Sequence, residues 1–215
     1  MVKSLLAFVG AAALTVTSNA NASAIITFGA TSPVPGNNDF QSDLASLGLT
    51  LFTTTGATIT LNEDSVITFE VLGTESSFDD RFTANGVDYT ETTTFANLFG
   101  TPLSIGSDFF TSGSLWNVLN FSSAGGMNAT VGDDGFGIFL GANDLSGLST
   151  NVFYIGYDDQ VLDPDDNHDD LVIRATVSPA VPEPATWAMM LLGFGAIGFA
   201  LRRYPLSEVK LRRAG

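Results

Sequence analysis

The chain has 215 residues, 23 Asp and Glu against 8 Lys and Arg, and no cysteine. A formal net charge of −15 excludes nucleic acid as a partner, because an acidic surface repels the phosphate backbone. Without cysteine, neither disulfides nor thiolate metal sites can support the fold.

The N-terminus has the organisation of a secretory signal peptide. Lys3 precedes an uncharged, largely apolar run over residues 4–16, and small residues at Ala-x-Ala spacing follow, ending with Ala22 and Ala24. A basic start, a short apolar core and a small-residue end are the three parts of such a peptide. We therefore expect residues 1–24 to direct export, with signal peptidase cleaving after Ala22 or Ala24. An N-terminal membrane anchor is the alternative, and the short core argues against it.

Export leaves a strongly acidic domain. Between Ile25 and Val181 only Arg81 and Arg174 remain, against twenty-one Asp and Glu, which gives a net charge near −19. This charge favours divalent cations as partners. About 155 residues are enough to bury a core without disulfides.

Residues 25–178 are predicted to form one all-β domain. Short runs rich in Thr, Phe, Val and Ile alternate with turns that contain Gly. The predicted strands are Ala24–Gly29, Leu49–Thr54, Thr58–Leu61, Ser65–Leu72, Gly86–Thr93, Leu115–Phe121, Gly135–Leu140, Val152–Tyr157 and Leu171–Val177. A short helix is predicted at Asp39–Leu47, and Asn85-Gly86 and Asp134-Gly135 are typical of hairpin turns. Many short strands with Gly-rich turns favour an antiparallel β-sandwich of jelly-roll type.

The densest acidic segment lies between two predicted strands, where residues 158–170 contain seven carboxylates. Asp163, Asp165, Asn167 and Asp169 alternate, so one face of an extended loop would present four oxygen ligands. Ca²⁺ takes six to eight oxygens in flexible geometry, and we predict a calcium site at these four residues. The loop is not an EF-hand, because His168 stands where that motif needs Gly. The alternative is a solvated loop whose acidic side chains cap turns.

Catalysis finds little support in the sequence. His168 is the single histidine, and no Gly-x-Ser-x-Gly nucleophile motif exists. Paired carboxylates can hydrolyse glycosides, but among twenty-one acids no pair is informative. Asp79 or Asp80 is expected to form an ion pair with Arg81 at a turn. We therefore expect no enzymatic activity.

The C-terminus begins with Pro182-Glu183-Pro184 and continues into seventeen uncharged residues, 185–201. Arg202 and Arg203 follow directly. A membrane crossing needs roughly twenty apolar residues, with a lower limit near seventeen, so 185–201 is predicted as a transmembrane helix. The arginines favour a cytoplasmic end, and Trp187 suits the opposite interface.

This order of Pro182-Glu183-Pro184, Trp187, apolar helix and paired arginines resembles the PEP-CTERM sorting signal of Gram-negative bacteria, in its PEPxxWA subtype. Residues 179–215 would form this signal, as linker, helix and basic tail. Its basic tail is longer than usual, because twelve residues follow Arg203. The resemblance implies cleavage near the Pro-Glu-Pro sequence by exosortase, a membrane-embedded protease, after anchoring in the inner membrane.

Two other interpretations of the tail find less support. Residues 193–198 spell Gly-x-Gly-x-x-Gly, but the strand and amphipathic helix of a dinucleotide site are missing around them. Small residues for close helix contact in a membrane explain them better. Tails of this kind also occur on ice-binding proteins, but the threonines here do not recur at a fixed spacing.

The sequence therefore predicts an exported, non-enzymatic protein of the cell surface or extracellular matrix, associated with exopolysaccharide as the resemblance implies. The rival prediction is a secreted β-sandwich that binds or hydrolyses carbohydrate. Exposed aromatic side chains would support the rival, and the candidates are Tyr89, Trp116, Tyr154 and Tyr157.

Overall fold

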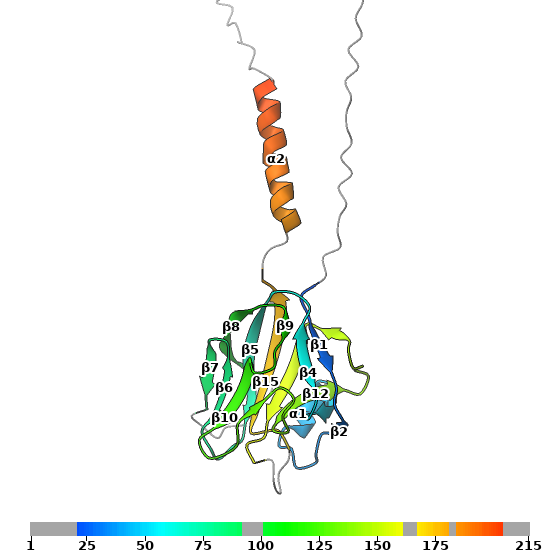
Figure 1. The fold of residues 1–215 in the computed structure, drawn as a ribbon, viewed down its shortest axis with the longest axis vertical. Helices are drawn as coiled ribbons and strands as arrows, with labels where there is room; N and C mark the ends of the chain where they lie inside the picture. Colours follow the sequence, from blue (N-terminus) through cyan, green and yellow to red (C-terminus); the bar gives the residue numbers. More distant parts are fainter. Residues whose placement is uncertain (1–20, 92–100, 161–166, 181–183, 204–215) are drawn as a thin grey trace, which may run out of the picture.

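The computed structural model describes residues 21–91, 101–160, 167–180 and 184–203. These residues are mostly β, with antiparallel sheets in an open, multi-sheet arrangement (Figure 1). The strands are β1 (Ala24–Thr27), β2 (Thr31–Pro33), β3 (Leu49–Thr53), β4 (Thr58–Leu61), β5 (Ser65–Thr74), β6 (Asp80–Ala84), β7 (Val87–Thr90), β8 (Leu103–Phe110), β9 (Gly113–Ser114), β10 (Leu119–Ser123), β11 (Ala129–Thr130), β12 (Phe136–Gly141), β13 (Ser149–Thr150), β14 (Val152–Tyr157) and β15 (Leu171–Pro179). The helices are α1 (Gln41–Ser46) and α2 (Pro184–Arg203).

The strands form one large sheet and two small ones. The large sheet has seven strands in the order β2-β3-β12-β14-β15-β5-β8. The small sheets have four strands each, in the orders β13-β1-β4-β9 and β11-β10-β6-β7. Every strand pair is antiparallel, as predicted.

All nine predicted strands overlap observed strands, and two of them, β4 and β14, match to the residue. The predicted helix at Asp39–Leu47 is α1. Six observed strands were not predicted: β2, β6, β8, β9, β11 and β13. Asn85-Gly86 makes the predicted hairpin between β6 and β7, with both residues at positive φ. Asp134-Gly135 does not make a hairpin, because β11 and β12 on either side of it belong to different sheets.

The large sheet packs on both small sheets through one hydrophobic core, and aromatic rings join it to the sheet that contains β6 and β10. Phe69 of the large sheet lies against Phe82 of a small sheet, with ring centroids 5.0 Å apart. Phe121 of that small sheet stacks on Tyr157 of the large sheet at 4.9 Å. Aromatic pairs of this kind are worth about 0.5–1.5 kcal/mol beyond the area that they bury.

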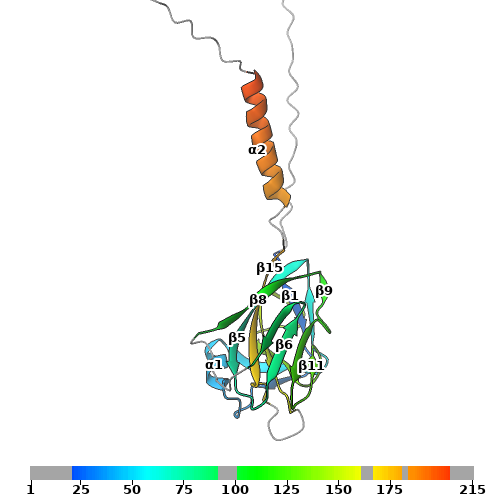
Figure 2. The same ribbon diagram turned by 90° about the vertical axis from the view of Figure 1, so that its left-hand side faces the viewer.

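The other face of the large sheet is covered by α1, which lies on the side of β5 and β15 away from β6 and β11 (Figure 2). Leu44 of α1 and Phe40 before it are buried there with Leu72 of β5. Gly73 allows this contact, because a Cβ atom on it would lie 2.6 Å from the ring of Phe40.

The export signals flank this domain. Residues 1–20 of the predicted signal peptide lie outside the described residues. Ala22 is buried in the core, and Ala24 begins β1, where it pairs with Leu61. Cleavage after Ala22 would therefore leave β1 whole, whereas cleavage after Ala24 would remove its first residue.

The predicted transmembrane segment 185–201 is a helix, since α2 spans Pro184–Arg203. In the part of the chain that the structure describes, no helix combines the length and the apolarity that a membrane crossing requires. The helix is thus confirmed and the membrane span is not.

Candidate functional site

Carboxylates gather at the end of the domain where β15 begins, opposite the end from which the chain continues to α2 (Figure 1). Five strand ends meet there, because β5, β7 and β14 finish where β6 and β15 start. We call this group the acidic end, and its members are Glu75, Asp80, Glu91, Asp158, Asp159, Asp169 and Asp170. All but Glu75 and Asp170 are buried.

Asp80 lies at a core-facing position because β6 alternates. Asp80, Phe82 and Ala84 are fully buried, while Arg81 between them is exposed. The backbone N–H of Glu91 donates to the Asp80 carbonyl oxygen at 2.7 Å, so Glu91, which directly follows β7, lies opposite Asp80. Two carboxylates in directly opposite positions repel each other and destabilise the strand pair.

Asp159 and Asp170 approach Asp80 from the large sheet. The N–H of Asp159 donates to Asp170 Oδ2 at 2.7 Å, and the Ser76 hydroxyl donates to Asp159 Oδ2 at 3.0 Å. The carboxylates of Asp80, Asp159 and Asp170 each place an oxygen within 4.8 Å of the others. A second group in the described residues, Glu75, Asp169 and Asp170, meets the same distance.

Burial and mutual repulsion raise the pKa of several groups here. Burial raises the pKa of Asp80 to about 6, the hydroxyls of Ser123 and Ser76 oppose this rise, and Asp159 adds to it. Burial raises the pKa of Asp170 to about 8; the N–H of Asp159 opposes the rise and its carboxylate adds to it. Burial raises the pKa of Glu91 to about 7, against the Thr74 hydroxyl and with the Asp80 charge. Placing all these charges together is thus unfavourable.

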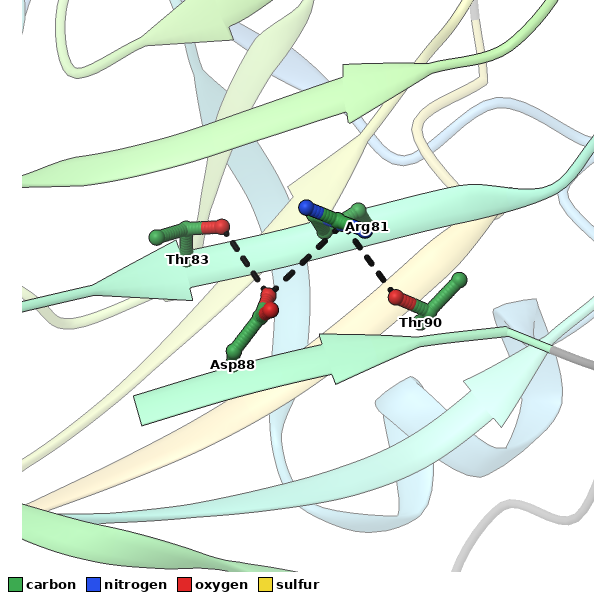
Figure 3. A network of polar contacts seen from close by, with 4 residues as sticks. All are labelled: Arg81, Thr83, Asp88 and Thr90. Carbon is green, nitrogen blue, oxygen red and sulfur yellow. Dashed lines mark hydrogen bonds and ion pairs between the residues drawn. The ribbon is translucent and has the colours of Figure 1, made fainter. Parts of the chain in front are cut away.

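The two arginines of the domain lie elsewhere. Figure 3 shows Arg81 in an exposed network, 3.7 Å from Asp88 and donating to the Thr90 hydroxyl at 3.2 Å. Arg174 contacts Glu70 at 2.7 Å. The predicted pairing of Arg81 with Asp79 or Asp80 is therefore wrong: Arg81 pairs with Asp88 on the neighbouring strand, and Asp80 points to the opposite face of β6.

Only half of the predicted calcium site lies in the described residues. Asp163 and Asp165 lie outside them. Asn167 accepts a hydrogen bond at its carbonyl oxygen from the Asn38 side chain at 2.7 Å, and Asp169 Oδ2 accepts one from the Asp39 N–H at 2.6 Å. These two residues therefore bind the segment before α1 through hydrogen bonds. Calcium binding by the four predicted residues remains a prediction.

Sequence reasoning missed Asp80 and Glu91 as members of a site. The signal was alternation: Asp80 shares its parity with Phe82 and Ala84, and Glu91 shares its parity with Val87 and Tyr89. That parity places both carboxylates on the buried face.

Of the four aromatic candidates for carbohydrate binding, Trp116 alone is exposed, with 62 % of its surface accessible. Tyr157 is fully buried, and Tyr89 and Tyr154 are partly buried against core clusters. Trp116 lies between β9 and β10.

The comparisons with known proteins identify the tail. Residues 180–203 match the PEP-CTERM protein-sorting motif, which begins one residue after β15 ends. Neither the curated proteins nor the solved structures give a match to the chain. The match covers the sorting signal and leaves the β domain to be interpreted from its own geometry.

Proposed function

We propose that this chain is an exported, non-enzymatic protein of the cell surface or extracellular matrix, whose β domain is the cargo that the tail delivers. The observation that carries the proposal is the match of residues 180–203 to the PEP-CTERM motif. This motif implies an exported protein that exosortase processes.

The position of the motif supports processing that spares the domain. Pro179 is the last residue of β15, and α2 begins at Pro184. The Pro-Glu-Pro sequence at 182–184 thus follows the core strand directly. Cleavage there would remove α2 and leave every strand of the three sheets in place.

The architecture fits such a cargo domain. We describe it as a β-sandwich of jelly-roll type, which is supported by the core that the large sheet shares with both small sheets. The proposal that it is not an enzyme is supported by the sequence, in which His168 is the single histidine and no Gly-x-Ser-x-Gly nucleophile motif occurs.

The test is the mass and location of the protein in a host with active exosortase. We expect the exported form to have lost residues up to about Ala22–Ala24 and the apolar tail from near 182–184. Replacing Pro182-Glu183-Pro184 by alanines should leave the tail attached and the protein unsorted. A surface form that still carries Leu191–Arg203 would contradict the proposal.

Association with exopolysaccharide is the second candidate function, supported by the exposed Trp116, since a flat exposed ring can stack on a sugar. Affinity electrophoresis through gels that contain the host polysaccharide would test it. We expect Trp116→Ala to lose the retardation and Phe109→Ala, another exposed aromatic site, to keep it. Equal migration of wild type with and without polysaccharide would reject this function.

A further inference from the structure

We propose that the acidic end is a binding site for Ca²⁺, with the carboxylates of Asp80, Asp159 and Asp170 as its charged ligands. This site differs from the one predicted at Asp163, Asp165, Asn167 and Asp169. The new site connects the start of β6, in a small sheet, with the end of β14 and the start of β15 in the large sheet.

Unsatisfied buried oxygens carry the proposal. Asp80 is fully buried, and neither of its carboxylate oxygens accepts a hydrogen bond. Asp159 is 1 % exposed, and its Oδ1 also accepts none. The Ser76 and Ser123 hydroxyls lie beside both carboxylates, but each has a single proton and donates it to Asp159 Oδ2. Buried acceptors without donors are rare in native proteins and call for a bound ion or another partner.

In the described β domain, neither arginine contacts these oxygens. Arg81 and Arg174 are the basic residues between Ile25 and Val181, and they contact Asp88 and Glu70. Glu91, opposite Asp80, adds another buried carboxylate and so increases the excess of negative charge. An external cation is the simplest source of the missing positive charge.

The donor set and its spacing select the ion. Carboxylate and hydroxyl oxygens are ligands for hard cations, and Ca²⁺ binds oxygen at about 2.3–2.6 Å. A single Ca²⁺ can therefore bridge oxygens up to roughly 4.6–5.2 Å apart. The oxygens of Asp80, Asp159 and Asp170 lie within 4.8 Å of one another, which fits that span. The Ser76 and Ser123 hydroxyls, both beside Asp159 Oδ2, are the nearby neutral donors.

The experiment uses the purified protein, stripped of metal with EDTA and compared in CaCl₂, in MgCl₂ and in NaCl of matched ionic strength. We expect Ca²⁺ at about a hundredfold excess over Kd to raise the Tm by roughly 6–10 °C. Matched NaCl should raise it far less, because screening cannot satisfy buried oxygens. Mg²⁺ should act more weakly than Ca²⁺, because it demands octahedral geometry and keeps its waters.

Variants distinguish binding at the acidic end from a general relief of charge repulsion. Asp80→Asn should raise Kd by about tenfold or more in calorimetric titration with CaCl₂, because one of three charged ligands is lost. Without metal, the same variant should melt at or above the wild-type temperature, because a buried like charge has been removed. Asp170→Asn removes another of the three charged ligands and should weaken Ca²⁺ binding in the same way. Asp88→Asn is the matched control, since it removes an exposed charge from the same small sheet.

Three outcomes would overturn the proposal. The first is an equal response to CaCl₂ and to matched NaCl. The second is a full Ca²⁺ response in both Asp80→Asn and Asp170→Asn. The third is loss of the response in Asp163→Asn/Asp165→Asn with retention in Asp80→Asn, which would place the ion at the loop residues instead.

Discussion

Phe82 and Asp80 lie two residues apart on β6, point to the same face and are both fully buried, yet they affect stability with opposite signs. Phe82 packs between the rings of Phe69 and Phe121, with centroids 5.0 and 5.3 Å away. The carboxylate of Asp80 faces other carboxylates and accepts no hydrogen bond. We infer that the packing of the aromatic core supplies the stability that offsets the unfavourable burial of the Asp80 carboxylate.

Truncating Phe82 in the aromatic core should cause the largest loss of stability. Phe82→Ala removes a fully buried ring from the core between the sheets, and we expect it to destabilise the domain by about 3–5 kcal/mol. Thermal and denaturant unfolding would measure the loss. Phe109→Ala is the control, because Phe109 is 45 % exposed and its truncation should cost far less. Similar losses for both variants would contradict the central place given to Phe82.

Adding a side chain at Gly156, in the large sheet, should cause the second-largest loss of stability. A Cβ atom on Gly156 would lie 2.6 Å from the Phe139 ring and would also clash with the backbone oxygen of His168. The backbone cannot move aside cheaply, so Gly156→Ala should cost about 1–3 kcal/mol. A Cβ atom on Gly36 would have no neighbour within 4 Å, so Gly36→Ala should leave the stability nearly unchanged in the same unfolding assay.

A change in pH should alter the contribution of Asp80 to the stability of the domain and leave that of Phe82 unchanged. Carboxyls whose pKa is raised by folding stabilise the folded state while protonated, and that contribution is lost as they ionise. The contribution of these carboxyls to the stability of the metal-free protein should therefore be largest below about pH 4, the pKa of the unfolded groups. It should fall as the pH rises through the pKa values of about 6, 7 and 8 of Asp80, Glu91 and Asp170.

This pH effect is measured by melting the EDTA-treated protein between pH 5 and 8, and we expect a progressive loss of stability, because each pKa unit by which folding raises a carboxyl is worth about 1.4 kcal/mol. Asp80→Asn should flatten the profile, and Asp88→Asn should not. A stability that rises over this range would show that these carboxyls are not destabilised by burial.

The smallest effect is expected at the ion pair of the large sheet. Arg174 and Glu70 face each other on β15 and β5 with a contact of 2.7 Å, and both are partly exposed. A double-mutant cycle with Arg174→Gln and Glu70→Gln should give a coupling of at most about 1 kcal/mol. A coupling of several kcal/mol would mean that this pair, like the acidic end, is shielded from water.

Sequence patterns predicted β5, β14 and β15 well, because these strands carry dense runs of β-branched and aromatic residues. They missed the eight-residue β8, most of whose residues are exposed. They missed β9, β11 and β13, since strands of two residues are made by their partners and not by their own propensity. For the site, the segment 158–170 was recognised as acidic, and the partner Asp80 was not. No local pattern places residue 80 beside residues 159 and 170, because that contact arises from the packing of two sheets.

The path of β15 has a mechanical consequence. Its first residue follows Asp170, its last residue precedes the sorting signal, and between them it is hydrogen-bonded to β14 on one side and β5 on the other. If the C-terminus is fastened to the cell surface, a pull on the domain runs along the axis of this central strand. Both ladders then lie parallel to the load and must give way together, which makes forced extraction of β15 slow.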